Sequence, residues 1–169
     1  MKVETLYFKP TATIPNSRLP VLIYRDVISG SCEAFETKLR LNGWFPDWYS
    51  SKGLYPKHHF HSDAHELIGF TRGTQQGRLG GEDGVEVQLN KGDVVVLPAG
   101  VAHLGIAISD DLHTVGAYPM GYGIHDFRLC EEAEFSSALE SVLRVPIPPM
   151  DPLYGAAGAL TELWSRPTV

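Results

Sequence analysis

Short stretches of alternating or continuous apolar residues recur along most of the chain, and they predict a structure built mainly of strands. Two lie near the N-terminus, at residues 3–8 and 19–24. From residue 48 onward they follow one another closely, at residues 48–55, 58–61, 66–71, 85–89, 93–97, 103–109 and 112–118. Short strands separated by turns rich in Gly, Asp and Asn are typical of a β-barrel or β-sandwich.

Helical periodicity is confined to the flanks of this strand-rich region. The three predicted helices span residues 31–41, 131–143 and 159–164. Ser29 or Ser31 can cap the start of the first helix, and Gly43 follows its end. The second begins with acidic residues and ends at Arg144, which suits the helix dipole. We therefore expect an all-β core with helices at both ends.

The composition is consistent with one domain. With 169 residues, 43% of them hydrophobic, the chain can bury one core and is too short for two ordinary domains. We therefore expect a single domain over residues 1–169. Its expected parts are N-terminal strands and a helix (residues 1–47), a metal-binding β-barrel core (residues 48–127) and a helical, proline-rich extension (residues 128–169).

Charge and sequence bias exclude several classes of protein. The longest apolar run, residues 94–97, is far shorter than the roughly 20 residues of a membrane span, and the N-terminus lacks a secretory signal pattern. The net charge is −6 and basic residues do not cluster, which argues against nucleic acid. Cys32 and Cys130 are too few for a disulfide framework and are expected to be buried free thiols. We expect a cytoplasmic protein whose partner is a small molecule.

Two blocks between residues 53 and 103 carry the candidate chemistry. The first consists of Gly53, five residues, His59, Phe60, His61, four residues, Glu66, six residues and Gly73; the second consists of Gly92, five residues, Pro98, Ala99, Gly100, two residues and His103. Imidazole and carboxylate groups are common ligands of divalent transition metals. Together the blocks predict one metal site.

Strand alternation indicates how these side chains can meet. His59 and His61 are two residues apart and point to the same face of a strand. A turn at residues 62–64 lets Glu66 face them from the next strand, and His103 arrives from the second block. Without that turn, His65 would take the place of Glu66, and the ligand set would be four histidines. Otherwise His65 serves as a hydrogen-bonding neighbour or faces away.

The spacing of both blocks resembles the two motifs of the cupin superfamily, and further strings resemble the bacterial YjlB-like single-domain cupins. These strings include His-Phe-His-Ser at 59–62, Ala-His-Glu-Leu at 64–67, Gly-Ala-Tyr-Pro at 116–119 and Asp-Pro-Leu-Tyr-Gly at 151–155. The resemblance implies an all-β cupin fold, that is, a double-stranded β-helix or jelly-roll barrel with flanking N- and C-terminal helices. Its implied metal ligands are His59, His61, Glu66 and His103. Many second motifs carry Asn where this chain has Ala107.

The resemblance also implies one divalent ion, with Fe, Mn, Ni and Zn as candidates. Three neutral imidazoles and one carboxylate give such a site a net charge near +1 and leave two positions of an octahedral ion open. Dioxygenase-, isomerase- and decarboxylase-type reactions all suit this site. The alternatives are a non-catalytic barrel that binds or senses a small ligand, and an interaction scaffold with a relic site. Cupins tend to pair through exposed sheet edges, so we expect a homodimer to which the N-terminal strands contribute.

Alternation also predicts the walls of the pocket around the ion. The residues expected to line it are Tyr55, Lys57, Ile68, Phe70, Arg72 and Ala107. Lys57 or Arg72 either holds a substrate carboxylate or phosphate, or is a charge in water at the barrel rim. Tyr55 or Tyr118 either acts as an acid or base, or is a buried structural tyrosine. We interpret Trp48 as a packing anchor.

Overall fold

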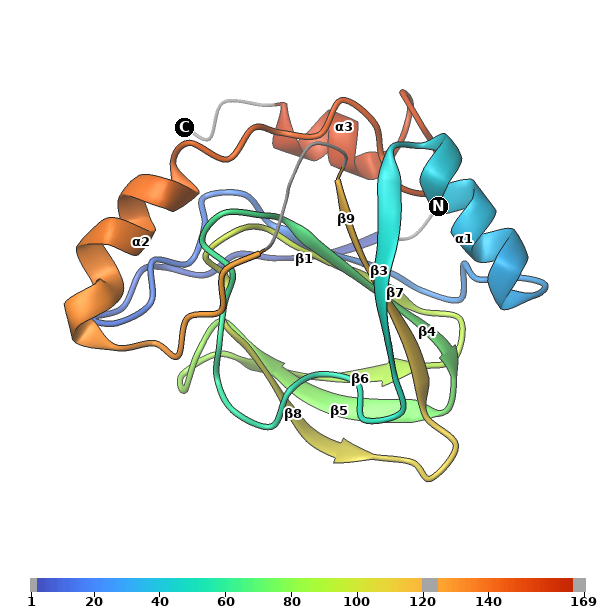
Figure 1. Cartoon of the computed structure of the whole chain (residues 1–169), viewed down its shortest axis with the longest axis horizontal. Coiled ribbons are helices and arrows are strands. Elements are labelled where there is room, and N and C mark those ends of the chain that lie inside the picture. The colour runs from blue at the N-terminus through green and yellow to red at the C-terminus, as the bar shows by residue number, and fades with distance from the viewer. Residues whose placement is uncertain (1–2, 120–124, 166–169) are drawn as a thin grey trace.

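Two antiparallel sheets lie face to face in the computed structural model, which describes residues 3–119 and 125–165 (Figure 1). The larger sheet has the strand order β1-β2-β7-β4-β9-β3, and the smaller has the order β6-β5-β8. The strands are β1 (Val3–Leu6), β2 (Val21–Tyr24), β3 (Trp44–Ser50), β4 (Glu66–Arg72), β5 (Thr74–Leu79), β6 (Val85–Asn90), β7 (Val94–Leu97), β8 (His103–Ile108) and β9 (His113–Pro119). The structure confirms the all-β class.

The centre of the larger sheet is buried on both faces, as strand β7 shows. All four of its residues are buried, and it pairs with β2 on one side and β4 on the other. Val94 and Val96 pack on the outer face with residues of the helices, whereas Val95 and Leu97 face the smaller sheet. A continuous apolar run is therefore required here, because both faces of the strand are covered.

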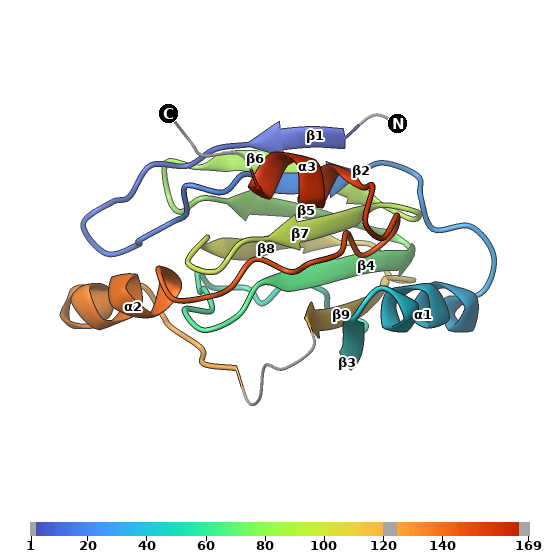
Figure 2. The same ribbon diagram turned by 90° about the horizontal axis from the view of Figure 1, so that it is seen from above.

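Helices cover the outer face of the larger sheet, on the side away from β5, β6 and β8 (Figures 1 and 2). They are α1 (Cys32–Leu41) and α3 (Ala159–Trp164). The remaining helix, α2 (Phe135–Val142), follows the 3-10 turn η1 (Glu132–Glu134) and lies at one end of the sheets, where Ala138 packs with Ile14, Phe60 and Ala102. Ser31 caps α1 by accepting a hydrogen bond from the Ala34 amide at 3.3 Å. The first and third predicted helices are confirmed, and the second is divided into η1 and α2. None of the described helices combines the length and hydrophobicity that a membrane span requires.

Three strand predictions were wrong. Strand β5 was missed because its sequence, Thr-Gln-Gln-Gly-Arg-Leu, is largely polar, although alternate residues are buried. Gln75 is one of them, and its side chain accepts a hydrogen bond from the Leu54 amide at 2.9 Å. Strand β3 occupies Trp44–Ser50 rather than residues 48–55. Residues 58–61 form isolated bridges, His59 with His103 and Phe60 with Arg128, instead of a strand.

Candidate metal centre

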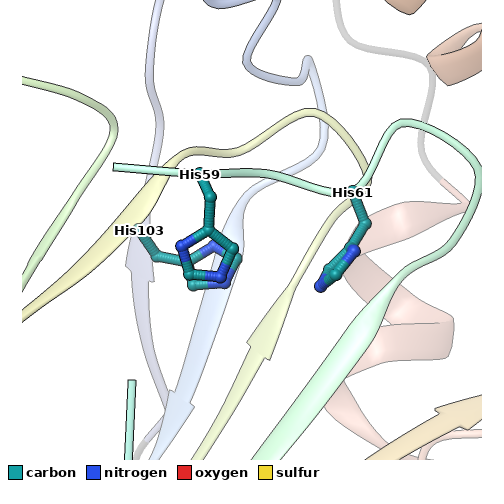
Figure 3. Close-up of side chains that lie close together, drawn as sticks. All are labelled: His59, His61 and His103. Carbon is teal, nitrogen blue, oxygen red and sulfur yellow. The ribbon is translucent and has the colours of Figure 1, made fainter. Parts of the chain in front are cut away.

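Three buried imidazoles converge at one end of the space between the sheets (Figure 3). One ring nitrogen from each of His59, His61 and His103 lies within 4.8 Å of the other two. The backbone brings two of them together directly, since the His59 amide donates to the His103 carbonyl at 3.2 Å and the His103 amide donates to the His59 carbonyl at 2.9 Å. His61 follows on the same side of the chain, two residues after His59.

Each imidazole is oriented by a backbone carbonyl beside its Nδ1 atom. The Nδ1 of His59 lies 2.9 Å from the carbonyl oxygen of Lys57, and that of His103 lies 3.1 Å from the carbonyl oxygen of Val101. The Nδ1 of His61 contacts the carbonyl oxygen of Asp126. A carbonyl can only accept, so each Nδ1 carries the hydrogen, and in the neutral rings each Nε2 lone pair is free for a cation.

Glu66, at the start of β4, supplies the fourth candidate donor. Its Oε2 lies 3.3 Å from the Nε2 of His103 and 3.5 Å from the Nε2 of His61. The other oxygen, Oε1, accepts hydrogen bonds from the hydroxyl of Tyr118 at 2.7 Å and the indole Nε1 of Trp48 at 3.2 Å. Within the described part of the chain, Oε2 is buried and has no polar neighbour of this kind other than these two imidazoles.

The electrostatics of the cluster favour positive charge. Burial alone would raise the pKa of the Glu66 carboxyl, but the facing imidazoles of His61 and His103 hold it well below its usual range. Burial opposes the charged form of His61, yet Glu66 outweighs it and raises the pKa of His61 to about 9. Burial, reinforced by the neighbouring His103, lowers the pKa of His59 to about 3. The Glu66 carboxylate thus stays charged and favours the charged form of His61, whereas His59 stays neutral.

These residues are compatible with a divalent cation. Donors about 2.1 Å from one ion lie roughly 3 Å apart when they occupy adjacent octahedral positions, and somewhat farther apart in a tetrahedron. The separations of 3.3 and 3.5 Å between Glu66 Oε2 and the two imidazoles are close to that spacing. An ion between these groups would satisfy Oε2 and the Nε2 atoms together.

A cavity of about 280 Å³ opens onto the cluster. Besides the four candidate ligands, it is lined by Trp48, Ser50, Gly53, Leu54, Tyr55, Ile68, Tyr118 and Phe127. The ring of Phe127 stacks on that of His59, with centroids 4.4 Å apart and planes 18° apart. The ring of His125 stacks on that of Tyr118 with centroids 3.6 Å apart. The cavity walls are therefore mainly aromatic and aliphatic.

Residues 125–128 were missed by sequence reasoning, although they hold one side of the site. The carboxylate of Asp126 accepts hydrogen bonds from the Ser62 amide at 2.6 Å and from the Arg128 Nε at 2.6 Å. The Asp63 carboxylate in turn accepts from the Asp126 amide at 3.1 Å. Asp126 and Ser62 are 64 residues apart, and no motif spacing links them, so only the fold brings them together.

Two predicted pocket residues line the cavity, and four do not. Tyr55 and Ile68 are among its walls. Lys57 lies in a loop, where strand alternation does not apply, and faces a separate cavity. Phe70 lies deeper in the apolar core between the sheets. Arg72 and Ala107 are exposed because irregularities in the pairing of β4 with β9 and of β5 with β8 interrupt the alternation before each of them.

His65 lies outside the cluster, on the outer face of the sheet. Its Nδ1 accepts a hydrogen bond from the Ala99 amide at 3.0 Å, and its ring packs against Trp164 with centroids 4.7 Å apart. Burial lowers its pKa to about 4. Bends at residues 62–63 direct Glu66 toward the imidazoles, so the alternative with four histidines is wrong.

Comparison with known proteins identifies the family of this chain and a relative that matches nearly its full length. The family model of the AraC-like ligand binding domain matches residues 47–144, and the chain belongs to this family of cupin domains. YjlB from Bacillus subtilis (strain 168) is 31% identical over 168 residues, which cover 98% of each chain. The resemblance to YjlB-like cupins is thereby confirmed.

Solved structures give more distant similarities. A crystal structure of DMSP lyases is 19% identical, with a TM-score of 0.37, over 67% of this chain and 44% of that one. Acireductone dioxygenase from Bacillus anthracis, with a cadmium ion in its active center, is 18% identical, with a TM-score of 0.33, over 66% of this chain and 56% of that one. The chain thus spans about half the length of each of these two structures.

Proposed function

We propose that this protein binds one divalent metal ion through His59, His61, Glu66 and His103, and binds or converts a small molecule beside that ion. The observation that supports the proposal is the convergence of three imidazoles, two of which, those of His61 and His103, face the buried Oε2 of Glu66. Fe, Mn, Ni and Zn are the candidate ions. When bound, the ion supplies Lewis-acid or redox chemistry of the kind used by dioxygenases, isomerases and decarboxylases.

The chain's own residues have distinct roles in this proposal. Backbone carbonyls hold the imidazole Nδ1 atoms and fix the direction of each ring. Tyr118 and Trp48 hold Glu66 Oε1 and so aim Oε2 at the imidazoles. Tyr55 and Phe127, whose rings meet edge to face at 5.3 Å, line the cavity and are each about half exposed, so they lie where it opens to water.

A non-catalytic ligand-binding or sensor protein is the second candidate function. The match of residues 47–144 to the model of a ligand-binding domain favours it. Saturable binding of a small molecule without its conversion would support this candidate. Metal-dependent conversion of a substrate would support the enzyme. Both candidates require the same ion and the same cavity.

The metal site can be tested by elemental analysis of the purified protein and of two matched variants. We expect about one divalent ion per chain, lost in His59→Ala because one of four ligands is removed. His58→Ala should retain the ion, since His58 is the adjacent residue but is outside the cluster. Equal metal content in the two variants, or a metal-free wild-type protein after incubation with each candidate ion, would contradict the proposal.

Two broader expectations accompany this function. We propose that residues 1–169 form one cupin domain, with the barrel core at residues 48–127. We also propose that the protein is a homodimer. Strand β1 supports the second proposal because it is an edge strand, paired with β2 on one side of the sheet.

A further inference from the structure

The cavity beside the candidate metal centre contains no cationic lysine or arginine among its described lining residues. We infer, on the basis of the proposed function, that the ligand is a small oxygen chelator with an uncharged aromatic or aliphatic body. A vicinal diol or a hydroxyketone belongs to this class. A phosphate ester or a polycarboxylate does not.

Three cations near the cavity are paired or line other cavities, and the exposed Lys52, next to Gly53, is not among the lining residues. Arg128, the nearest in sequence to the lining residue Phe127, binds Asp126 at 2.6 Å and Glu134 at 3.3 Å. Lys57 faces a separate cavity that contains Glu82 and Asp83. Arg72 lines a third cavity with Lys91 and His113. The ion would therefore be the main positive charge that a ligand meets.

Polar side chains in the cavity are largely committed to one another. The Trp48 indole nitrogen donates to Glu66 Oε1 and to the Tyr118 hydroxyl, each at 3.2 Å. The Tyr118 hydroxyl donates to Glu66 Oε1 at 2.7 Å, and the Ser50 hydroxyl oxygen accepts from the Lys52 amide at 2.9 Å. The hydroxyls of Ser50 and Tyr55 remain as neutral donors, but no lysine or arginine lines the described cavity, so a second anionic group would meet no opposite charge there.

The charge balance leads to the same class of ligand. Three neutral imidazoles, one carboxylate and a divalent ion carry about +1 in total, which a ligand that loses one proton on binding would neutralise. A further carboxylate on the ligand, placed against the buried Ile68 and Leu54, would have no cation beside it. Burial of an unpaired charge is strongly unfavourable. The volume of about 280 Å³ is at the lower end for ligand pockets and also favours a small molecule.

Two chelating probes that differ at one group test this inference. Both 4-methylcatechol and 3,4-dihydroxybenzoate can chelate an ion through vicinal hydroxyls, but only the second carries a carboxylate on its body. Isothermal titration calorimetry of the metal-loaded protein without oxygen measures each affinity, and metal content is checked after titration. We expect 4-methylcatechol to bind at least about ten-fold more tightly, a difference of about 1.4 kcal/mol.

A matched pair of variants then tests whether the lack of a cation in the cavity causes the preference for the uncharged probe. Tyr55 lines the cavity mouth and is 45% exposed, so its replacement should be tolerated. Tyr55→Lys places a cation there and should reduce the preference for the uncharged probe at least about three-fold. Tyr55→Met removes the same ring without adding charge, and it should keep the wild-type preference.

The outcomes separate this inference from the function on which it rests. A protein that binds no metal contradicts the proposed function. A metal-loaded protein that binds the carboxylate probe as well as or better than 4-methylcatechol, or binds neither probe, overturns the ligand class and leaves the metal site standing. An equal effect of Tyr55→Lys and Tyr55→Met shows that charge is not the cause and also overturns the inference.

Discussion

Glu66 shows how much of the site depends on the hydrogen bonds of a single residue. Its side chain is 4% exposed, and the two oxygens have different environments. Oε1 is held by Tyr118 and Trp48, whereas Oε2 faces the imidazoles of His61 and His103. Burial, together with the nearby negative charge of Glu66, raises the pKa of Tyr118 above its usual range, so this hydroxyl remains a donor.

Removal of the Tyr118 hydroxyl should therefore weaken metal binding without removing a ligand. We expect Tyr118→Phe to reduce metal affinity about 10- to 100-fold, the usual effect of losing a group that orients a ligand. Titration against a chelator of known affinity measures the change. Tyr7→Phe is a suitable control, because Tyr7 is 59% exposed and does not line the cavity. An unchanged affinity in Tyr118→Phe would show that Glu66 needs no such support.

At the scale of elements, the C-terminal segment is attached to the larger sheet through the buried carboxylate of Asp151. This group accepts hydrogen bonds from the amides of Leu153 at 2.9 Å, Tyr154 at 3.0 Å and Leu160 at 2.9 Å. It also accepts from the hydroxyl of Tyr24, on β2, at 2.6 Å. One carboxylate therefore fixes both the turn after residue 151 and the position of α3 over the sheet.

This contact predicts a dependence of stability on alkaline pH. Burial, and then the charge of Asp151, raises the pKa of Tyr24 well above its usual value near 10. Above about pH 10 the unfolded chain loses this proton while the folded chain keeps it. The contribution of Tyr24 to stability is therefore complete below that pH and falls, by up to about 1.4 kcal/mol per pH unit, as the pH rises further.

Urea unfolding of the wild type and Tyr24→Phe at about pH 8 and pH 10.5 can test this dependence. At the lower pH, we expect the free energy of unfolding of the wild type to exceed that of Tyr24→Phe by about 1–3 kcal/mol, because the variant leaves Asp151 with one donor fewer. The difference should shrink at the higher pH. A difference that is the same at both values would mean that Tyr24 does not titrate differently in the folded and unfolded chains.

Sequence patterns located most elements but not their exact pairing. α1, α3 and the strands with apolar alternation were recognised, because burial of one face leaves a regular pattern in the sequence. β5 was missed because Gln75 and Gly77 take buried positions that usually contain apolar residues. The pairing irregularities before Arg72 and Ala107 were also unpredictable, since they arise from how each strand meets its neighbour.

At the scale of the whole molecule, the strand order leaves β1 and β3 at the two edges of the larger sheet. Exposed edges favour pairing with another chain. We expect light scattering to give twice the mass of one chain. Tyr7→Lys, which puts a charge beside β1, should shift the protein toward a monomer, whereas Leu41→Lys, on α1, should not. A monomeric wild type at micromolar concentration would contradict the homodimer.

The sequence alone determined the class of fold and the chemical character of the site. Alternating and continuous apolar runs require sheets covered on one or both faces. The spacing of the two blocks indicated three imidazoles that the structure brings together, His59, His61 and His103, and the Glu66 carboxylate that faces two of them. Both are local properties, set by which residues follow one another. Their assignment as metal ligands stays a prediction that elemental analysis can test.

Only the tertiary structure decided what surrounds those side chains. Tyr118, Trp48 and Asp126 come from parts of the chain far from the histidines, and they meet the site because the sheets close around it. Lys57 lies outside the cavity because it is in a loop, and Arg72 does so because the pairing of β4 with β9 is irregular before it. Contacts between distant segments form when the barrel closes, and the spacing of residues in the sequence does not predict which segments then meet.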